Sequence, residues 1–232
     1  MDRRTYLGAA GIAGLTSVAG CLGGALGGNG ENAGHPDAVL GPPEQDLSEA
    51  SHPSYGDEFP SVSVPDPLAD ETVSTDQFEG DRTVLLTVFY TMCPDGMCPQ
   101  LILRLRRAQE VAAQEGYGDD AAFLAMTFDP ERDTESELRT YANERSIDLD
   151  AGNWHFLRPE QYEDAKAIVT DDFGLPLEKR HDNDYEKLEY SFPHFPYIFL
   201  INEQGVVERV YPKATSRKPS EIVDDFETVV TA

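Results

Sequence analysis

Long hydrophobic runs alternate with amphipathic stretches in the part of the chain that follows residue 59. Residues 83–90 and 121–128 are continuous runs of aliphatic, β-branched and aromatic side chains, a pattern typical of strands buried on both faces. Two further runs, residues 197–202 and 206–211, flank a short glycine-containing segment and therefore predict a β-hairpin.

Helical spacing appears between these runs. The apolar residues Leu101, Leu105, Ala108 and Ala112 recur every three or four positions, which indicates a helix after the first strand. Thr134 and Glu137 have the spacing of a capping box, so a helix should begin there and continue to about residue 144. Further helices are expected over residues 160–169 and 219–231.

This order of elements predicts an α/β fold. Strands that alternate with helices, followed by a hairpin and a last helix, form a central mixed β-sheet flanked by helices, and thioredoxin-like folds have this order. The alternating residues 59–64 predict an arm of an N-terminal hairpin. The charged residues 177–191 predict an exposed insert.

The chain before residue 59 has a different composition. Residues 21–58 are rich in glycine and proline and lack apolar periodicity, so we interpret them as a flexible tether. The compact domain is expected to span residues 59–232, a normal size for one hydrophobic core.

The first twenty residues have the features of an export signal. Arg3 and Arg4 form a twin-arginine pattern, and a short run of small apolar residues leads to Cys21 in a sequence similar to a lipobox. Residues 1–20 are thus predicted to be a twin-arginine-type lipoprotein signal peptide. Lipidation of Cys21 would hold the protein on the extracytoplasmic face of the cell membrane. The alternative is an uncleaved apolar tail with an incidental cysteine.

Net charge excludes some partners. The chain carries 43 acidic and 18 basic residues and a formal charge of −25, so it should repel nucleic acid and anionic headgroups. Its hydrophobic runs argue against an acidic disordered protein. Evenly distributed acid with little lysine indicates a halophilic source, because concentrated salt screens self-repulsion.

Two thiols remain in the predicted domain. Cys93 and Cys98 lie where the first buried strand runs into a helix, and the unpaired amides at a helix amino terminus favour thiolate over thiol. Such a pair is either a redox couple or half of a site for a soft metal. The four intervening residues permit both, and a turn rich in proline and glycine is a poor place for two inert core cysteines.

His194 is the histidine best placed to join the thiols. It directly precedes the strand predicted at residues 197–202, and in a thioredoxin-like sheet the loop before that strand lies beside the cysteine turn. Two thiolates and an imidazole suit Cu(I) and can gain ligands as Cu(II). The other histidines are assigned to the tether, to packing or to a solvated insert: His35, His52, His155 and His181.

The motifs together resemble the Sco/SenC family. Its signature is similar to Phe89-Tyr90-Thr91-x-Cys93-Pro94-Asp95…Cys98-Pro99, to Phe128-Asp129-Pro130-Glu131-Arg132-Asp133-Thr134, and to a histidine before a strand that ends Leu-Ile-Asn. The resemblance covers residues 59–232. It implies a thioredoxin-like fold, a membrane anchor, and copper bound by Cys93, Cys98 and His194. Four residues separate the cysteines here, where the family usually has three.

In that family the implied work is to deliver copper to the binuclear copper site of a cytochrome c oxidase subunit, or to reduce the cysteines of that site. We therefore expect a copper chaperone, with a thiol–disulfide reductase as the alternative. A peroxide-reducing thiol enzyme has no separate support. The oligomeric state is left open.

Four residues are expected to support the site. Asp95 lies within the cysteine loop, and Asp129 and Arg132 are expected in a loop beside the metal pocket, with Arg132 paired to an acid. Pro196 stands where thioredoxin-like reductases place a cis-proline, so a cis peptide bond before it is predicted.

Overall fold

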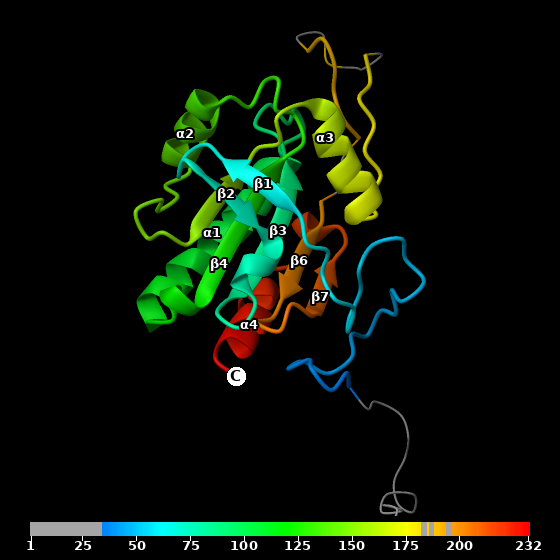
Figure 1. The fold of residues 1–232 in the computed structure, drawn as a ribbon, viewed down its shortest axis with the longest axis vertical. Coiled ribbons are helices and arrows are strands. Elements are labelled where there is room, and N and C mark those ends of the chain that lie inside the picture. The colour runs from blue at the N-terminus through cyan, green and yellow to red at the C-terminus, as the bar shows by residue number, and fades with distance from the viewer. Residues whose placement is uncertain (1–33, 182–184, 186–187, 194–195) are drawn as a thin grey trace, which may run out of the picture. The chain divides into compact units, whose positions relative to one another are not determined.

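The structure is a computed structural model that describes residues 34–181, 185, 188–193 and 196–232. All of these residues belong to one compact unit, Asn32–Ala232, shown in Figure 1. The predicted signal peptide and Cys21 lie outside the described residues.

A mixed five-stranded sheet forms the centre, in the order β5-β4-β3-β6-β7. Its strands are β3 (Thr83–Phe89), β4 (Ala121–Thr127), β5 (Trp154–Leu157), β6 (Ile198–Ile201) and β7 (Val207–Tyr211). The first three are parallel, whereas β6 is antiparallel to both β3 and β7. The predicted mixed sheet and its C-terminal hairpin are thus confirmed.

Helices and a small hairpin cover the two faces of this sheet. One face carries α1 (Met97–Glu115), α2 (Glu135–Glu144) and α4 (Pro219–Val230). Over the other lie the hairpin of β1 (Ser63–Asp66) and β2 (Glu71–Ser74) and the helix α3 (Tyr162–Ala167), in front of the sheet in Figure 1. A π-helical turn and three short 3-10 helices complete the elements: η3 (Ile168–Asp172), η1 (Thr75–Phe78), η2 (Gly118–Asp120) and η4 (Ala214–Ser216).

Aromatic rings join the sheet to the helices. Phe123 of β4 packs against Phe226 of α4 with ring centroids 5.5 Å apart, and Phe89 of β3 packs against Tyr141 of α2 at 5.5 Å. Every residue of β3 and β4 is buried, as the hydrophobic runs predict. Burial of both faces explains why these runs show no alternation.

Three element predictions need correction. The strand β5 was not expected, because its four residues are too short to give a pattern. The helix α1 begins at Met97, two residues before the expected proline. The N-terminal hairpin begins at Ser63, whereas an arm was predicted over residues 59–64.

The expected tether is shorter than predicted. Residues 34–58, here called the N-terminal strap, are hydrogen-bonded to the edge strand β7: the amides of Val39 and Leu40 donate to the carboxylate of Glu208 at 2.7 and 2.9 Å. The amide of Gly56 donates to the carbonyl of Val207 at 2.9 Å. These are backbone contacts, which composition does not reveal, so the folded unit extends well before residue 59.

The strap is also fixed at Gly174. Ser51 donates its hydroxyl to the carbonyl of Gly174 at 2.7 Å, and His52 is buried with its ring 5.3 Å from that of Tyr197. Gly174 has φ +64°, and a Cβ atom there would lie 1.9 Å from the carbonyl oxygen of Ser51. A side chain at this position would therefore displace the strap.

Replacing Gly174 with alanine should destabilise the protein by about 3 kcal/mol or more, because a steric clash adds to the ~1 kcal/mol cost of left-handed backbone. Gly152→Ala is the matched control, since Gly152 has φ +67° and a Cβ atom there would have no other atom within 4 Å. Chemical denaturation should separate the two variants. Equal losses of stability would show that the strap does not press on Gly174.

A buried carboxylate holds the loop that follows β3. Asp133 accepts hydrogen bonds from the amide of Thr91 at 3.1 and 3.2 Å, from the hydroxyl of Thr91 at 2.5 Å, and from the hydroxyl of Thr127 at 2.5 Å. One side chain thus joins the ends of β3 and β4 to the start of α2. Burial raises the pKa of Asp133 from 3.8 to about 6, against the opposing effect of the threonine donors.

The raised pKa of Asp133 predicts how the stability of the protein depends on pH. Because the folded protein holds the proton of Asp133 more tightly than the unfolded chain does, the stabilisation is complete below pH 3.8 and is lost as pH rises through about 6. Asp133→Asn stays neutral, so its unfolding free energy relative to the parent should rise by up to about 3 kcal/mol between about pH 4 and pH 7. Urea denaturation at several pH values measures this difference, and parallel curves would contradict it.

Candidate functional site

The two cysteines lie at one end of the sheet, where β3 and β4 end and β6 begins. Cys93 follows β3 in a loop, and Cys98 is in the first turn of α1. Among the described residues, neither forms a disulfide. The carboxyl ends of the parallel strands β3 and β4 and the amino end of the antiparallel strand β6 thus lie at the same end of the sheet as the two cysteines.

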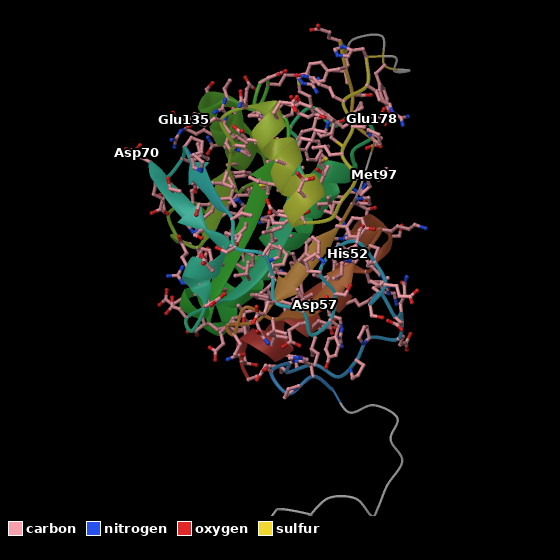
Figure 2. All side chains as sticks on the ribbon, turned by 45° about the vertical axis from the view of Figure 1, so that its right-hand side comes forward. His52, Asp57, Asp70, Met97, Glu135 and Glu178 are labelled. Carbon is pink, nitrogen blue, oxygen red and sulfur yellow. The ribbon has the colours of Figure 1, made fainter. Side chains whose placement is uncertain are left out.

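The loop between the cysteines has a defined turn. Gly96 adopts φ +76° directly before α1, a conformation that costs little only for glycine. Asp95 accepts a hydrogen bond from the amide of Met97 at 3.0 Å, and its Oδ1 lies 3.3 Å from the Cys93 sulfur. Figure 2 labels Met97 at the start of the helix.

The turn brings the sulfur of Cys93 to the helix end. The amide of Cys98 donates to Cys93 Sγ at 3.2 Å, so it is Cys93, half-buried, that receives a helix amide. Cys98 is only 3% exposed. Burial raises the pKa of the Cys98 thiol, and its hydrogen bond with Cys93 acts in the same direction. At Cys98 burial therefore outweighs the effect of the helix terminus, whereas the helix amide reaches Cys93.

His194 and Phe195 lie outside the described residues, but their neighbours are placed. Phe192 packs against the ring of Tyr90 at 5.2 Å, and Tyr90 is three residues before Cys93. On the other side, the carbonyl of Pro196 accepts from the amide of Ala214 at 2.7 Å. Both flanks of His194 therefore reach the cysteine end of the sheet. The predicted cis bond joins Phe195 to Pro196 and stays a prediction.

Asp129 and Arg132 form an ion pair beside this end, with Arg132 Nε donating to Asp129 Oδ2. Tyr190 donates its hydroxyl to Asp129 Oδ1 at 2.9 Å, and its ring lies 3.9 Å from the Arg132 guanidinium carbon. Burial raises the pKa of Asp129, while Arg132 acts in the opposite direction. Arg132 also donates to the carbonyl of Tyr190 at 3.2 Å. The pair therefore holds the segment that leads to His194.

The sequence interpretation missed the part played by the charged insert. Lys179 donates to Glu131 at 2.5 Å and lies 3.8 Å from the centre of the Tyr190 ring. Residues 177–191 were expected to be exposed, and an antiparallel bridge between Arg180 and Ser191 does form there. A tyrosine in a charged segment was the available signal, since its ring needs an apolar partner.

Other candidate groups lie elsewhere. His155 faces Asp66 across the hairpin, with Nδ1 3.2 Å from Oδ2, and so takes part in packing β1 on β5. Within the described ranges, no group of three His, Cys, Asp or Glu side chains is arranged to hold a metal ion. No helix among these residues is long and apolar enough to cross a membrane.

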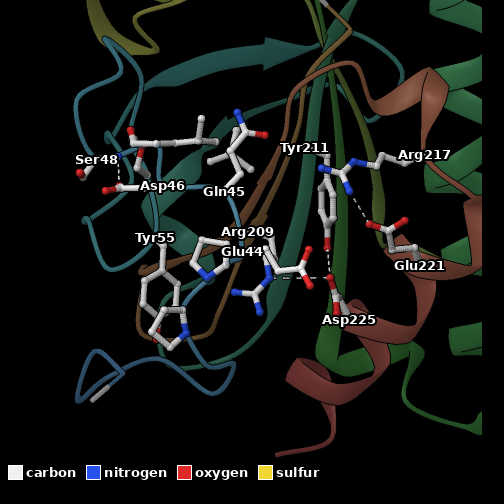
Figure 3. A pocket seen from close by; sticks show the side chains of 15 residues that line it. Glu44, Gln45, Asp46, Ser48, Tyr55, Arg209, Tyr211, Arg217, Glu221 and Asp225 are labelled. Carbon is white, nitrogen blue, oxygen red and sulfur yellow. Dashed lines mark hydrogen bonds and ion pairs between the residues drawn. The ribbon is translucent and has the colours of Figure 1, made fainter. Parts of the chain in front are cut away.

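A cavity of about 900 Å³ lies between the N-terminal strap, β7 and α4, and neither cysteine lines it. Figure 3 shows two contacts among the residues that line it: Arg217 contacts Glu221 at 2.9 Å, and Tyr211 donates to Asp225 at 2.7 Å. The cavity is therefore separate from the thiol site.

Several solved structures with the same fold are Sco proteins. ScoI of Bradyrhizobium japonicum with copper bound is 22% identical with a TM-score of 0.55, covering 75% of this chain and 99% of that one. A SCO1/SenC family lipoprotein from Bacillus anthracis is 18% identical with a TM-score of 0.57, covering 74% and 94%. BsSco, of the Sco family of cytochrome c oxidase assembly proteins, is 20% identical with a TM-score of 0.59, covering 75% and 94%.

These likenesses confirm the predicted thioredoxin-like fold. No curated protein sequence is significantly similar to this chain. The sequence pattern of one family, described as SCO1/SenC, matches residues 65–231, which is most of the chain and all of the elements that surround the thiols. The chain therefore belongs to the SCO1/SenC family.

Proposed function

We propose that this protein binds copper through Cys93, Cys98 and His194 and delivers it to the binuclear copper site of a cytochrome c oxidase subunit. The observation that carries the proposal is the pair of cysteines at the amino end of α1, in a chain that matches the SCO1/SenC family over residues 65–231. Relatives with the same fold have been solved with copper bound.

The donor set fits copper as cargo. Thiolates are soft ligands that select Cu(I), and an imidazole completes a three-coordinate site able to accept a further ligand. Cys98 is buried while Cys93 is half-buried, so one sulfur is fixed in the core and the other is nearer to solvent. This asymmetry suits ligand exchange, because an incoming thiolate can replace Cys93 before the buried sulfur releases the ion.

Thiol–disulfide exchange is the second candidate. The amide contact at 3.2 Å places Cys93 Sγ at the helix terminus, the position of an attacking thiolate. One relative, BsSco, has a disulfide switch. In this reading Cys93 attacks and Cys98 resolves the mixed disulfide, which leaves the acceptor's cysteines reduced and this pair oxidised.

A lipid on Cys21 would keep this activity at the extracytoplasmic face of the membrane. The twin-arginine pattern and the lipobox-like sequence support the anchor, and one relative with the same fold is a lipoprotein. The excess of acidic over basic residues, 43 against 18, supports a halophilic source.

His194→Ala should lower the copper affinity of the reduced protein at least about tenfold, since loss of a direct ligand exceeds the effect of an outer-shell partner. Competition with a chelator of known affinity, together with the metal-to-protein ratio, measures the change. His35→Ala is the matched control, because His35 lies on the strap. Cys93→Ser and Cys98→Ser should each abolish tight binding.

Unchanged copper affinity in His194→Ala would exclude the three-ligand site. Reduction of a disulfide peptide tests the second candidate in the same variants, because exchange needs both cysteines and no imidazole. Activity that survives His194→Ala but not Cys98→Ser would then assign the protein to thiol exchange.

A further inference from the structure

Two long segments of this acidic chain contain no acidic residue. Residues 96–109 include three arginines, and residues 209–220 include two arginines and two lysines, with no aspartate or glutamate in either. The whole chain has 43 acidic residues against 18 basic ones. Both segments therefore carry a net positive charge, although the chain as a whole is strongly acidic.

The two segments meet in the folded protein. The guanidinium of Arg104 on α1 donates to the carbonyls of Thr215 and Arg217 at 2.8 and 3.0 Å. Arg104 itself is buried, so it serves as the joint between the segments. On residues 209–220 the exposed cations are Lys213, Arg217 and Lys218, which we call the basic rim. Arg107 of α1 is also exposed, and it is paired with Glu110 at 2.8 Å.

The basic rim lies at the cysteine end of the sheet. Tyr211 at the end of β7 pairs with Ile198 at the start of β6, and Ala214 donates to the carbonyl of Pro196. Thr87, near the end of β3, pairs with the same Ile198. The chain that follows β7 therefore emerges beside the loop that follows β3, which carries Cys93.

The rim keeps free positive charge. Among the described residues, neither Lys213 nor Lys218 has a carboxylate within 4 Å, whereas Arg217 is paired with Glu221 at 2.9 Å. Asp95 lies 3.3 Å from the Cys93 sulfur. Two further acids, Asp129 and Glu131, are paired with Arg132 and Lys179.

Two exposed apolar side chains lie on the loop and the helix that carry the thiols. Met92, beside Cys93, is 48% exposed, and Leu103 on α1 is 46% exposed. These are two of the four large hydrophobic residues that are exposed in the described part of the chain. A surface with apolar side chains inside a charged border is the arrangement of a protein contact.

We propose that the basic rim and Met92 form a docking surface for an acidic, thiol-bearing segment of a protein partner. The inference rests on the proposed function in one respect, which is that the thiol of the partner approaches Cys93. Rim charges steer and orient a partner more than they add affinity. In a protein of charge −25 they give an acidic partner one face that does not repel it.

A lipid surface is the competing occupant. The N-terminal strap enters the domain at the other end of the sheet, where Asn202, after β6, donates to the carbonyl of Asp37 at 2.8 Å. The start of the strap therefore lies at the end of the sheet opposite to the loop that carries Cys93.

The test measures how fast Cys93 reacts with charged peptides. Glutamate-rich, serine-rich and lysine-rich peptides each carry one cysteine as a mixed disulfide with nitrothiobenzoate. The Cys93 thiolate attacks the peptide sulfur, the peptide disulfide breaks, and nitrothiobenzoate leaves as a coloured thiolate, so the exchange balances without an added oxidant or metal. The full, reduced chain is used in every arm.

The glutamate-rich peptide should react at least as fast as the serine-rich one. Lys218→Glu and Lys213→Glu should each slow it at least about threefold and should accelerate the lysine-rich peptide, with both effects shrinking at high salt. Lys166→Glu is the matched control, since Lys166 is exposed on α3 and changes the net charge equally. Far-ultraviolet circular dichroism checks that each variant folds.

Two results would overturn the proposal. One is a glutamate-rich peptide that reacts more slowly than the serine-rich peptide, with both rim variants behaving like Lys166→Glu. The other is binding to phosphatidylglycerol vesicles that Lys218→Glu removes while peptide rates stay unchanged, which would assign the rim to lipid. Neither readout involves copper, so failure here is distinguishable from failure of the copper proposal.

Discussion

The geometry of the site depends on the carboxylate of Asp133. It accepts hydrogen bonds from the amide and hydroxyl of Thr91, two residues before Cys93, and from the hydroxyl of Thr127 at the end of β4. The backbone hydrogen bond from Phe128 to the carbonyl of Phe89 joins the same strand ends at 3.1 Å, and Asp133 adds the link from these ends to the cysteine loop. A buried carboxylate lowers stability at neutral pH. In this protein it lies where the cysteine loop leaves the sheet.

The two thiols occupy different environments although they share one turn. Cys98 is enclosed by the core, which raises its pKa, while Cys93 is half-buried beside Asp95. A metal ion or an attacking partner thus meets one sulfur before the other. The loop toward His194 is held from the opposite side by Arg132 and Tyr190. The site is therefore built from two separately anchored loops on one sheet end.

The pattern of hydrophobic residues predicted those elements whose burial is visible in their own sequence. The runs of β3 and β4 and the cysteine turn were correctly placed for this reason. Other features depend on contacts distant in sequence: β5 exists because it pairs with β4, and the strap is ordered because its amides reach Glu208. From its glycine and proline content the strap was predicted to be part of a tether. The strap packs because Gly174, far along the chain, has no side chain and leaves room for it.

The folded strap also changes how far the domain can travel. With a tether over residues 21–58, an anchored domain would range up to about 130 Å from its lipid, at about 3.5 Å per extended residue. Because the domain already begins near residue 34, the same calculation gives at most about 45 Å. A lipid on Cys21 would then confine the domain to a thinner layer above the bilayer. A partner of an anchored domain would have to lie within that layer.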